Sequence, residues 1–234
     1  MNSIVKVKGV SSRFLRRGMV TVTLTGEVNA AMAEAFAEQF DRAVASGQPF
    51  IPVLINSSGG ALYEAPHIID RFSMAAVPVV TIVTGQAYSA AALIFSAGTE
   101  GYRYVSPHAS IMLHDVGVEE VSGKCAEVIV ETEELRRTNK RAYDLIAQNT
   151  GQEPPFFHEK VKTAGGADLY VDAQTALEWN LANHVGVPQL VTLVTVETQL
   201  LVGASLAAVG GQHLDVEAPT QSRKRAREED DDEE

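Results

Sequence analysis

Three side chains that can act together in nucleophilic catalysis follow short apolar or glycine-rich segments of this chain. Ser89 opens an alanine-rich stretch, His114 ends the apolar run Ile111–Leu113, and Asp168 follows Gly165–Ala167. An imidazole can accept the proton of a serine hydroxyl, and a carboxylate can fix the imidazole tautomer that this transfer needs. Each residue alone also has a simpler explanation, as a small helix residue, a buried histidine or a turn aspartate.

A pair of glycines provides a further candidate feature. The apolar run Phe50–Ile55 predicts a buried strand, and Asn56–Gly60 (NSSGG) is expected to break it sharply. Paired glycines allow a backbone to approach a ligand closely, although a simple tight turn would explain them equally well. A serine at a helix start lies beside unpaired N–H groups, which favour a developing oxyanion.

The remaining elements must position these residues. Alternating strand and helix patterns predict an α/β fold with much parallel pairing. Strands are expected at Met19–Thr25, Phe50–Ile55, Val77–Val83, Tyr102–Val105, Ala109–Leu113, Asp168–Val171 and His184–Val194. Helices are expected at Ala30–Ala45, capped by Asn29, and at Tyr63–Ala75, Ala87–Ala97 and Ala173–Asn180. The recurrence of Met32, Phe36, Phe40 and Val44 predicts the buried face of the first helix.

One long helix is predicted over Ser122–Asn149, with Gly151 after it. Its apolar seam is Val128, Leu135, Ala142 and Leu145. About 27 residues span about 40 Å, which is long for a domain of this size. We therefore expect the helix to project and to meet another subunit; the alternative is a shorter pair of helices.

Composition and charge argue against several classes of protein. The formal net charge of −11 makes general nucleic-acid binding a poor fit. Cys125 is the only cysteine, which excludes an internal disulfide and favours a reducing, cytoplasmic-type compartment. The N-terminus has no signal-peptide pattern, and polar residues interrupt Val187–Val209, so no membrane segment is expected. The chain beyond Glu217 should be disordered, and Arg223–Arg227 resembles a nuclear-targeting cluster or is simply a solvated tail.

Three segments resemble the Clp protease proteolytic subunit (ClpP) family. They are LINSSGGALYEAPHIID at 54–70, GQAYSAAALIFSAGTEGYRYVSPHASIMLHDV at 85–116, and GQEPPFFHEKVKTAGGADLYVDAQTALEWNLANHVG at 151–186. The first resembles the family's glycine segment, the second its nucleophile-to-histidine block, and the third the stretch that carries its acidic residue. The resemblance covers about 170 residues, from Met19 to Val187.

The resemblance implies roles for individual residues in a serine-type endopeptidase. Ser89 would be the nucleophile, His114 the general base and Asp168 the third member, with Asp172 as the alternative. The oxyanion hole would be formed by the backbone N–H groups of Gly60 and Ala90. No cofactor and no metal are implied.

The resemblance also implies an architecture and partners. A peptidase domain over 19–194 would adopt a crotonase-like spiral of ββα units with the long helix as a handle, between an N-terminal arm (1–18) and a C-terminal extension (195–234). Rings of identical subunits would stack around a chamber, and a ring-shaped AAA+ ATP-dependent unfoldase would feed it unfolded polypeptide.

Three positions depart from the family pattern: Ser58 replaces a usual proline, Asp115 a usual glutamine and Asn180 a usual glycine. Alternative functions are an assembly subunit that no longer cleaves and a crotonase-fold enzyme that acts on acyl-CoA. A Ser/Lys signal-peptide peptidase is disfavoured because no lysine lies between Gly60 and Lys124.

Overall fold

A computed structural model describes residues 19–117 and 121–188 of the chain. The expected N-terminal arm, the C-terminal extension and the basic cluster Arg223–Arg227 lie outside these residues. So do most of the expected strand His184–Val194 and the C-terminal limit of the proposed 19–194 domain.

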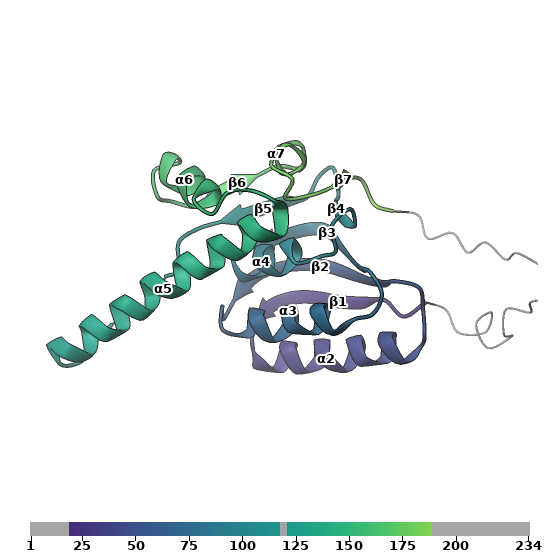
Figure 1. Ribbon diagram of the computed structural model, residues 1–234, viewed down its shortest axis with the longest axis horizontal. Helices are drawn as coiled ribbons and strands as arrows, with labels where there is room; N and C mark the ends of the chain where they lie inside the picture. The colour runs from purple at the N-terminus through teal and green to yellow at the C-terminus, as the bar shows by residue number, and fades with distance from the viewer. Residues whose placement is uncertain (1–18, 118–120, 189–234) are drawn as a thin grey trace, which may run out of the picture. The chain divides into compact units, whose positions relative to one another are not determined.

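A seven-stranded sheet forms the centre of the described part (Figure 1). Its strands are β1 (Val22–Val28), β2 (Ile51–Gly60), β3 (Val79–Tyr88), β4 (Arg103–Val105), β5 (Ser110–Leu113), β6 (Leu169–Val171) and β7 (His184–Val185). The order β1-β2-β3-β4-β7 is parallel throughout, as the alternation of strands and helices predicted. β5 continues the sheet beside the end of β3, and β6 pairs antiparallel with β5.

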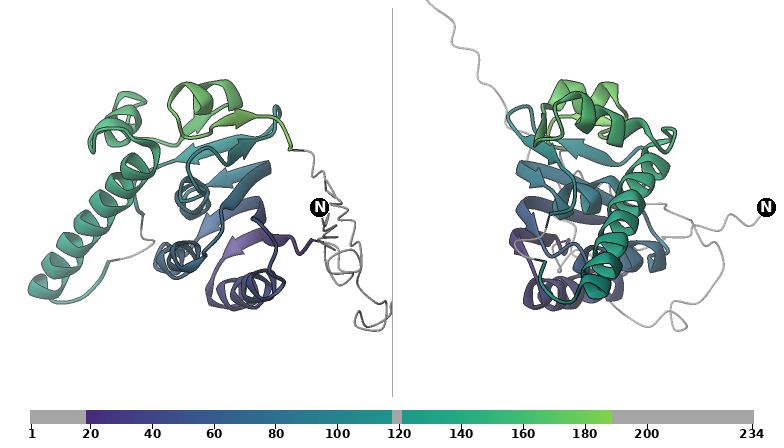
Figure 2. Two further views of the ribbon diagram at one scale, coloured as in Figure 1. Left: turned by 45° about the vertical axis from the view of Figure 1, so that its right-hand side comes forward. Right: turned by 90° about the vertical axis from the view of Figure 1, so that its left-hand side faces the viewer.

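Six helices accompany the sheet in the described residues. They are α2 (Ala30–Ala45), α3 (Glu64–Met74), α4 (Ala90–Ser96), α5 (Cys125–Thr150), α6 (Phe156–Thr163) and α7 (Ala173–Glu178). α2 packs on α3, α3 on α4 and α4 on α5, so these four follow one another beside the sheet (Figure 2). The short helix α6 was not predicted from the sequence.

The helix α2 confirms its predicted bounds and its cap. The Asn29 side chain accepts a hydrogen bond from the Met32 N–H at 3.0 Å. Phe36 and Phe40 are buried and pack against Phe72 of α3, with the Phe40 ring stacked on it. Val44 was wrongly placed on the buried face: it is half exposed, and small alanines fill the rest of that face, which lets α2 lie close to the sheet.

Two strands run further than predicted. β2 continues through the glycines to Gly60, because Glu27 and Val28 of β1 pair with Gly59 and Gly60 beyond a bulge. β3 likewise passes Gly85 and reaches Tyr88 by pairing with β5. The predicted break after Ile55 and the predicted turn at Gly85 were therefore wrong. Pairing with a neighbouring strand, β1 for β2 and β5 for β3, extends both strands beyond their apolar residues.

The long helix is present, three residues later at its start than predicted. Gly123 has a φ of +143°, and Lys124 caps the helix by donating its N–H to the Glu127 carboxylate at 2.9 Å. Gly151 ends it in the left-handed conformation. At 26 residues α5 is about 39 Å long, and its first half extends away from the sheet (Figures 1 and 2).

A buried arginine joins the last described segment to the sheet. Arg103 of β4 donates hydrogen bonds to the carbonyls of Gly98, Asn180 and Leu181 and pairs with Glu100 at 2.8 Å. Asn180 has a φ of +55°, a conformation that asparagine tolerates better than most residues. This accounts for asparagine at a position where the family usually has glycine.

Candidate active site

Ser89 lies at the junction of β3 and α4, where the backbone turns sharply. Its φ of 54° and ψ of −122° are rare for a residue with a side chain. The Ser89 N–H donates to the Met112 carbonyl of β5 at 2.9 Å, which fixes the junction. The helix thus begins at Ala90 rather than at the predicted Ala87, and Ser89 is its N-terminal flanking residue.

Gly59 makes this turn possible. A Cβ on Gly59 would lie 2.4 Å from the Tyr88 carbonyl oxygen and 2.8 Å from the Ser89 Cβ, closer than real contacts allow. Gly59 itself has a φ of +83°. The end of β2 therefore touches the serine junction directly, and any side chain at this position would displace it.

Both residues expected to supply oxyanion N–H groups lie near Ser89. Ala90 is the first residue of α4, where helix N–H groups lack intrahelical partners. Gly60 is exposed and lines the same pocket as Ser89. The buried Ser57 hydroxyl braces this strand end, donating to the Gly26 carbonyl and accepting the Gly59 N–H at 3.1 Å. Ser58, the departure from proline, is exposed and lies within β2.

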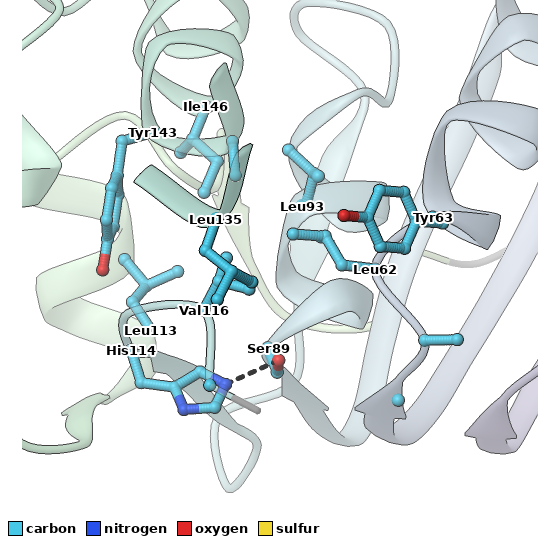
Figure 3. Close-up of a pocket in the computed structure, with 14 residues that line it drawn as sticks. Leu62, Tyr63, Ser89, Leu93, Leu113, His114, Val116, Leu135, Tyr143 and Ile146 are labelled. Carbon is cyan, nitrogen blue, oxygen red and sulfur yellow. Dashed lines mark hydrogen bonds between the residues drawn. The ribbon is translucent and has the colours of Figure 1, made fainter. Parts of the chain in front are cut away.

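His114 is the first residue after β5, and its side chain points at Ser89. The Ser89 Oγ lies 2.7 Å from the His114 Nε2 (Figure 3). These two residues are 25 positions apart in the sequence, and the parallel pairing of β3 with β5 brings them together.

Asp168 faces the other nitrogen of the same imidazole. The last pair of the antiparallel ladder is Leu113 with Leu169, so the next positions outward are His114 and Asp168. The Asp168 Oδ1 lies 3.6 Å from the His114 Nδ1, just beyond hydrogen-bond length. Their side chains are 34% and 49% exposed.

Asp172, the alternative third member, is engaged elsewhere. It caps α7, and its Oδ1 accepts the Thr175 N–H at 2.7 Å. That hydrogen bond lowers the pKa of the Asp172 carboxyl below its ordinary value. The geometry brings Asp168, and not Asp172, to the imidazole.

An apolar pocket of about 320 Å³ opens beside Ser89 (Figure 3). One wall is the segment from Gly60 to Tyr63, and the other runs from Leu113 to Gly117. Its floor is formed by Leu93, Leu135, Ala142, Tyr143 and Ile146. A cavity lined in this way accommodates an apolar side chain beside the serine hydroxyl.

Two residues of α5, Asn139 and Tyr143, were not recognised as part of this region from the sequence. They form a hydrogen-bonded group with Asp115, the residue after His114. Asn139 and Tyr143 lie 24 and 28 positions from Asp115, which leaves no local signal. The sequence did place the Asp115 carboxylate near the base, but not its partners.

No cluster of potential metal ligands occurs among the residues that the structure describes. Within the same residues, no helix is both long and apolar enough to cross a membrane.

Comparison with known proteins identifies the family. The family model described as Clp protease matches residues 5–189, most of the chain. The chain belongs to the Clp protease family. The predicted α/β class and ClpP architecture are confirmed by a solved structure of a ClpP1 mutant from Listeria monocytogenes. That chain has 24% identity and a TM-score of 0.64, and the match covers 71% of this chain and 91% of that one.

Clp protease relatives from other organisms match a shorter part of the chain. The "ATP-dependent Clp protease proteolytic subunit 2" of Rhodococcus jostii is 33% identical over 135 residues, 58% of this chain and 67% of that protein. The protein of the same name from Mycolicibacterium paratuberculosis is 30% identical over 149 residues, 64% of this chain and 72% of that protein.

The contact between Gly59 and Ser89 yields a stability prediction. Gly59→Ala should lower the free energy of unfolding by about 2 kcal/mol more than Gly101→Ala, because a cramped site must shift. Gly101 is a matched control: its φ is +84°, and no atom lies within 4 Å of its would-be Cβ. Denaturant unfolding of both variants measures the difference, and equal losses would contradict the tight contact.

Proposed function

We propose that this chain is a Clp-type serine endopeptidase, a hydrolase that cleaves peptide bonds of unfolded proteins or peptides. The observation that carries the proposal is the 2.7 Å contact between the Ser89 Oγ and the His114 Nε2 at a strained strand–helix junction. Membership of the Clp protease family supports the same reaction.

In the proposed reaction His114 acts first as a base and then as an acid. The Asp168 carboxylate favours the imidazole tautomer with its proton on Nδ1, which leaves Nε2 to accept the Ser89 hydroxyl proton. Ser89 Oγ then attacks the substrate carbonyl carbon, and His114 returns the proton to the departing amine. Water, activated by the same imidazole, hydrolyses the resulting ester.

The backbone N–H groups of Gly60 and Ala90 would stabilise the tetrahedral oxyanion. Each such donor contributes about 2.7–4 kcal/mol to the transition state in enzymes of this kind. Ala90 begins α4 directly after Ser89, and Gly60 lines the same pocket as Ser89, which supports this role. No side-chain charge is needed, because N–H dipoles held by the fold require little reorganisation.

The substrate backbone would lie between the two walls of the pocket, along Gly60–Tyr63 and the chain after His114. Extended peptides bind to such segments through main-chain hydrogen bonds. The apolar floor favours an apolar side chain, such as leucine, at the residue that precedes the cleaved bond.

The first prediction from this proposal concerns covalent labelling. A fluorophosphonate probe should modify the wild-type protein at Ser89 only, because the Ser89 hydroxyl has an imidazole 2.7 Å away to accept its proton. Ser89→Ala and His114→Ala should both abolish labelling, as detected by intact-protein mass spectrometry. A native oligomer that does not label would instead favour a subunit that has lost catalysis.

Substrate preference can be read with paired peptidyl phosphonates in the same assay. A probe with leucine beside the phosphonate should label faster than one with aspartate, because the pocket would have to desolvate a charge. Equal rates would rule out this pocket as the site that receives that side chain.

The third member of the triad is tested by Asp168→Asn beside Asp172→Asn. Asp168→Asn should lower kcat by about 10²–10⁴-fold, because an amide stabilises the wrong tautomer and no longer balances the imidazolium. Asp172→Asn should keep kcat within about twofold, because asparagine caps helices as well as aspartate does. The reverse order in a peptide-hydrolysis assay would assign the role to Asp172.

We also propose that copies of this chain assemble into stacked rings and act with an ATP-dependent unfoldase. The names of the relatives, "ATP-dependent Clp protease proteolytic subunit 2", support a subunit that acts with an ATP-dependent partner. The assembly is supported by Ile129 and Val130, which are 56% and 69% exposed on the projecting part of α5. An exposed apolar pair on a helix suits contact with another copy.

Native mass spectrometry tests the assembly. The mass should be a multiple of the chain mass, and replacing both Ile129 and Val130 with glutamate should reduce it, because the contact would bury unpaired charge. A wild-type monomer at micromolar concentration would contradict the chamber.

A further inference from the structure

The base of the candidate site stands outside the sheet. β5 ends at Leu113, so His114 is the first residue beyond the last ladder pair. The catalytic contact with Ser89 needs the imidazole to hold its position within a fraction of an ångström. Contacts made by the following residues, Asp115 and Val116, therefore control where His114 lies.

A single asparagine of α5 holds this segment with both ends of its amide. The Asn139 Oδ1 accepts the Val116 N–H at 2.9 Å, and the Asn139 Nδ2 donates to the Asp115 Oδ1 at 2.9 Å. One contact holds the main chain and the other holds a side chain, so Asn139 fixes both the position and the direction of the segment.

Tyr143, one helical turn further along α5, adds a third hydrogen bond. Its hydroxyl donates to the same Asp115 Oδ1 at 3.1 Å, and its ring is 3% exposed. Burial raises the pKa of the Tyr143 phenol, and the neighbouring Asp115 carboxylate raises it further. Tyr143 therefore stays protonated and remains a donor. The His158 ring of α6 stacks on Tyr143 at 5.1 Å.

From these contacts we propose that Asn139, with Asp115 and Tyr143, positions His114 for catalysis by tying it to α5. This inference rests on the proposed peptidase function. None of the three touches the reacting atoms; they act through the main chain of residues 114–116. Because His114 directly precedes Asp115 and Val116, holding these two residues against α5 limits the directions that the His114 side chain can take and keeps it toward Ser89.

The same contacts keep a second carboxylate away from the base. Asp115 adjoins His114 in sequence, and a free carboxylate there could compete with the Ser89 hydroxyl or with Asp168 for the imidazole. Two donors from α5 occupy its Oδ1 instead. Because Asp115 is held in this way, it does not disturb the orientation of the imidazole toward Ser89.

Asn139→Ala tests the positioning, with Asn149→Ala as its matched control. Asn149 lies on the same helix and donates to the Ser96 Oγ at 3.0 Å, which docks α5 without touching the His114 segment. We expect Asn139→Ala to lower kcat by about tenfold or more with KM within about twofold, since substrate still binds but the base is misplaced. Asn149→Ala should retain kcat within about twofold even if both variants melt earlier.

A reciprocal exchange supplies the rescue. Asn139→Asp sets two carboxylates against each other and should lower kcat at least as much as Asn139→Ala. Adding Asp115→Asn restores a donor–acceptor pair of reversed polarity and leaves an oxygen at position 139 for the Val116 N–H. The double variant should recover most of the wild-type kcat and of the wild-type fluorophosphonate labelling rate.

The outcomes separate this inference from the function on which it rests. A wild-type protein that neither labels nor cleaves would overturn both. A wild-type protein that labels, with an Asn139→Ala variant of unchanged kcat, would overturn the positioning role alone. Equal losses in Asn139→Ala and Asn149→Ala, or a double variant no better than Asn139→Asp, would also overturn it.

Discussion

The candidate site depends on one backbone constraint, the turn that takes the chain from β3 into α4 at Ser89. Its dihedral angles are unfavourable for a side-chain-bearing residue, so neighbouring structure must maintain them. Gly59 packs against the turn from one side, and the Met112 carbonyl accepts the Ser89 N–H from the other. The sheet thus holds a strained serine between two strands, beside an apolar pocket.

The order of the strands brings the two other candidate residues to this serine. β5 lies beside the end of β3, which brings His114 to Ser89, and the antiparallel β6 returns to bring Asp168 to His114. Each of the three residues comes from the end of a different strand. Strand pairing therefore brings the three residues together.

Much of this arrangement could be predicted from the sequence, for identifiable reasons. The helix Ala30–Ala45 has a capping asparagine and a regular apolar pattern, so its bounds were correct. The ends of β2 and β3 were missed because glycines there resemble turns, while the pairing that extends them involves distant residues. Asp168 and Asp172 are nearly equivalent by local pattern. The register of β6 and the cap of α7 separate their positions, and neither can be read from one segment. Asn139 carried no signal at all, since its partners lie 23 and 24 positions away.

The length of α5 determines how far movements of its exposed end displace Asn139. The helix is buried only near its end, at Tyr143, Ile146, Ala147 and Thr150, apart from Thr138, while its first two turns are largely exposed. It therefore resembles a lever anchored near residue 147, with Asn139 close to the fulcrum and Cys125 at the tip. From the constant rise per residue, a sideways displacement of the tip moves Asn139 by only about a third as much. A small sideways movement of the Cys125 end therefore reaches Asn139, and through it His114, only in part. Rotation of the helix about its own axis turns Asn139 by the full angle.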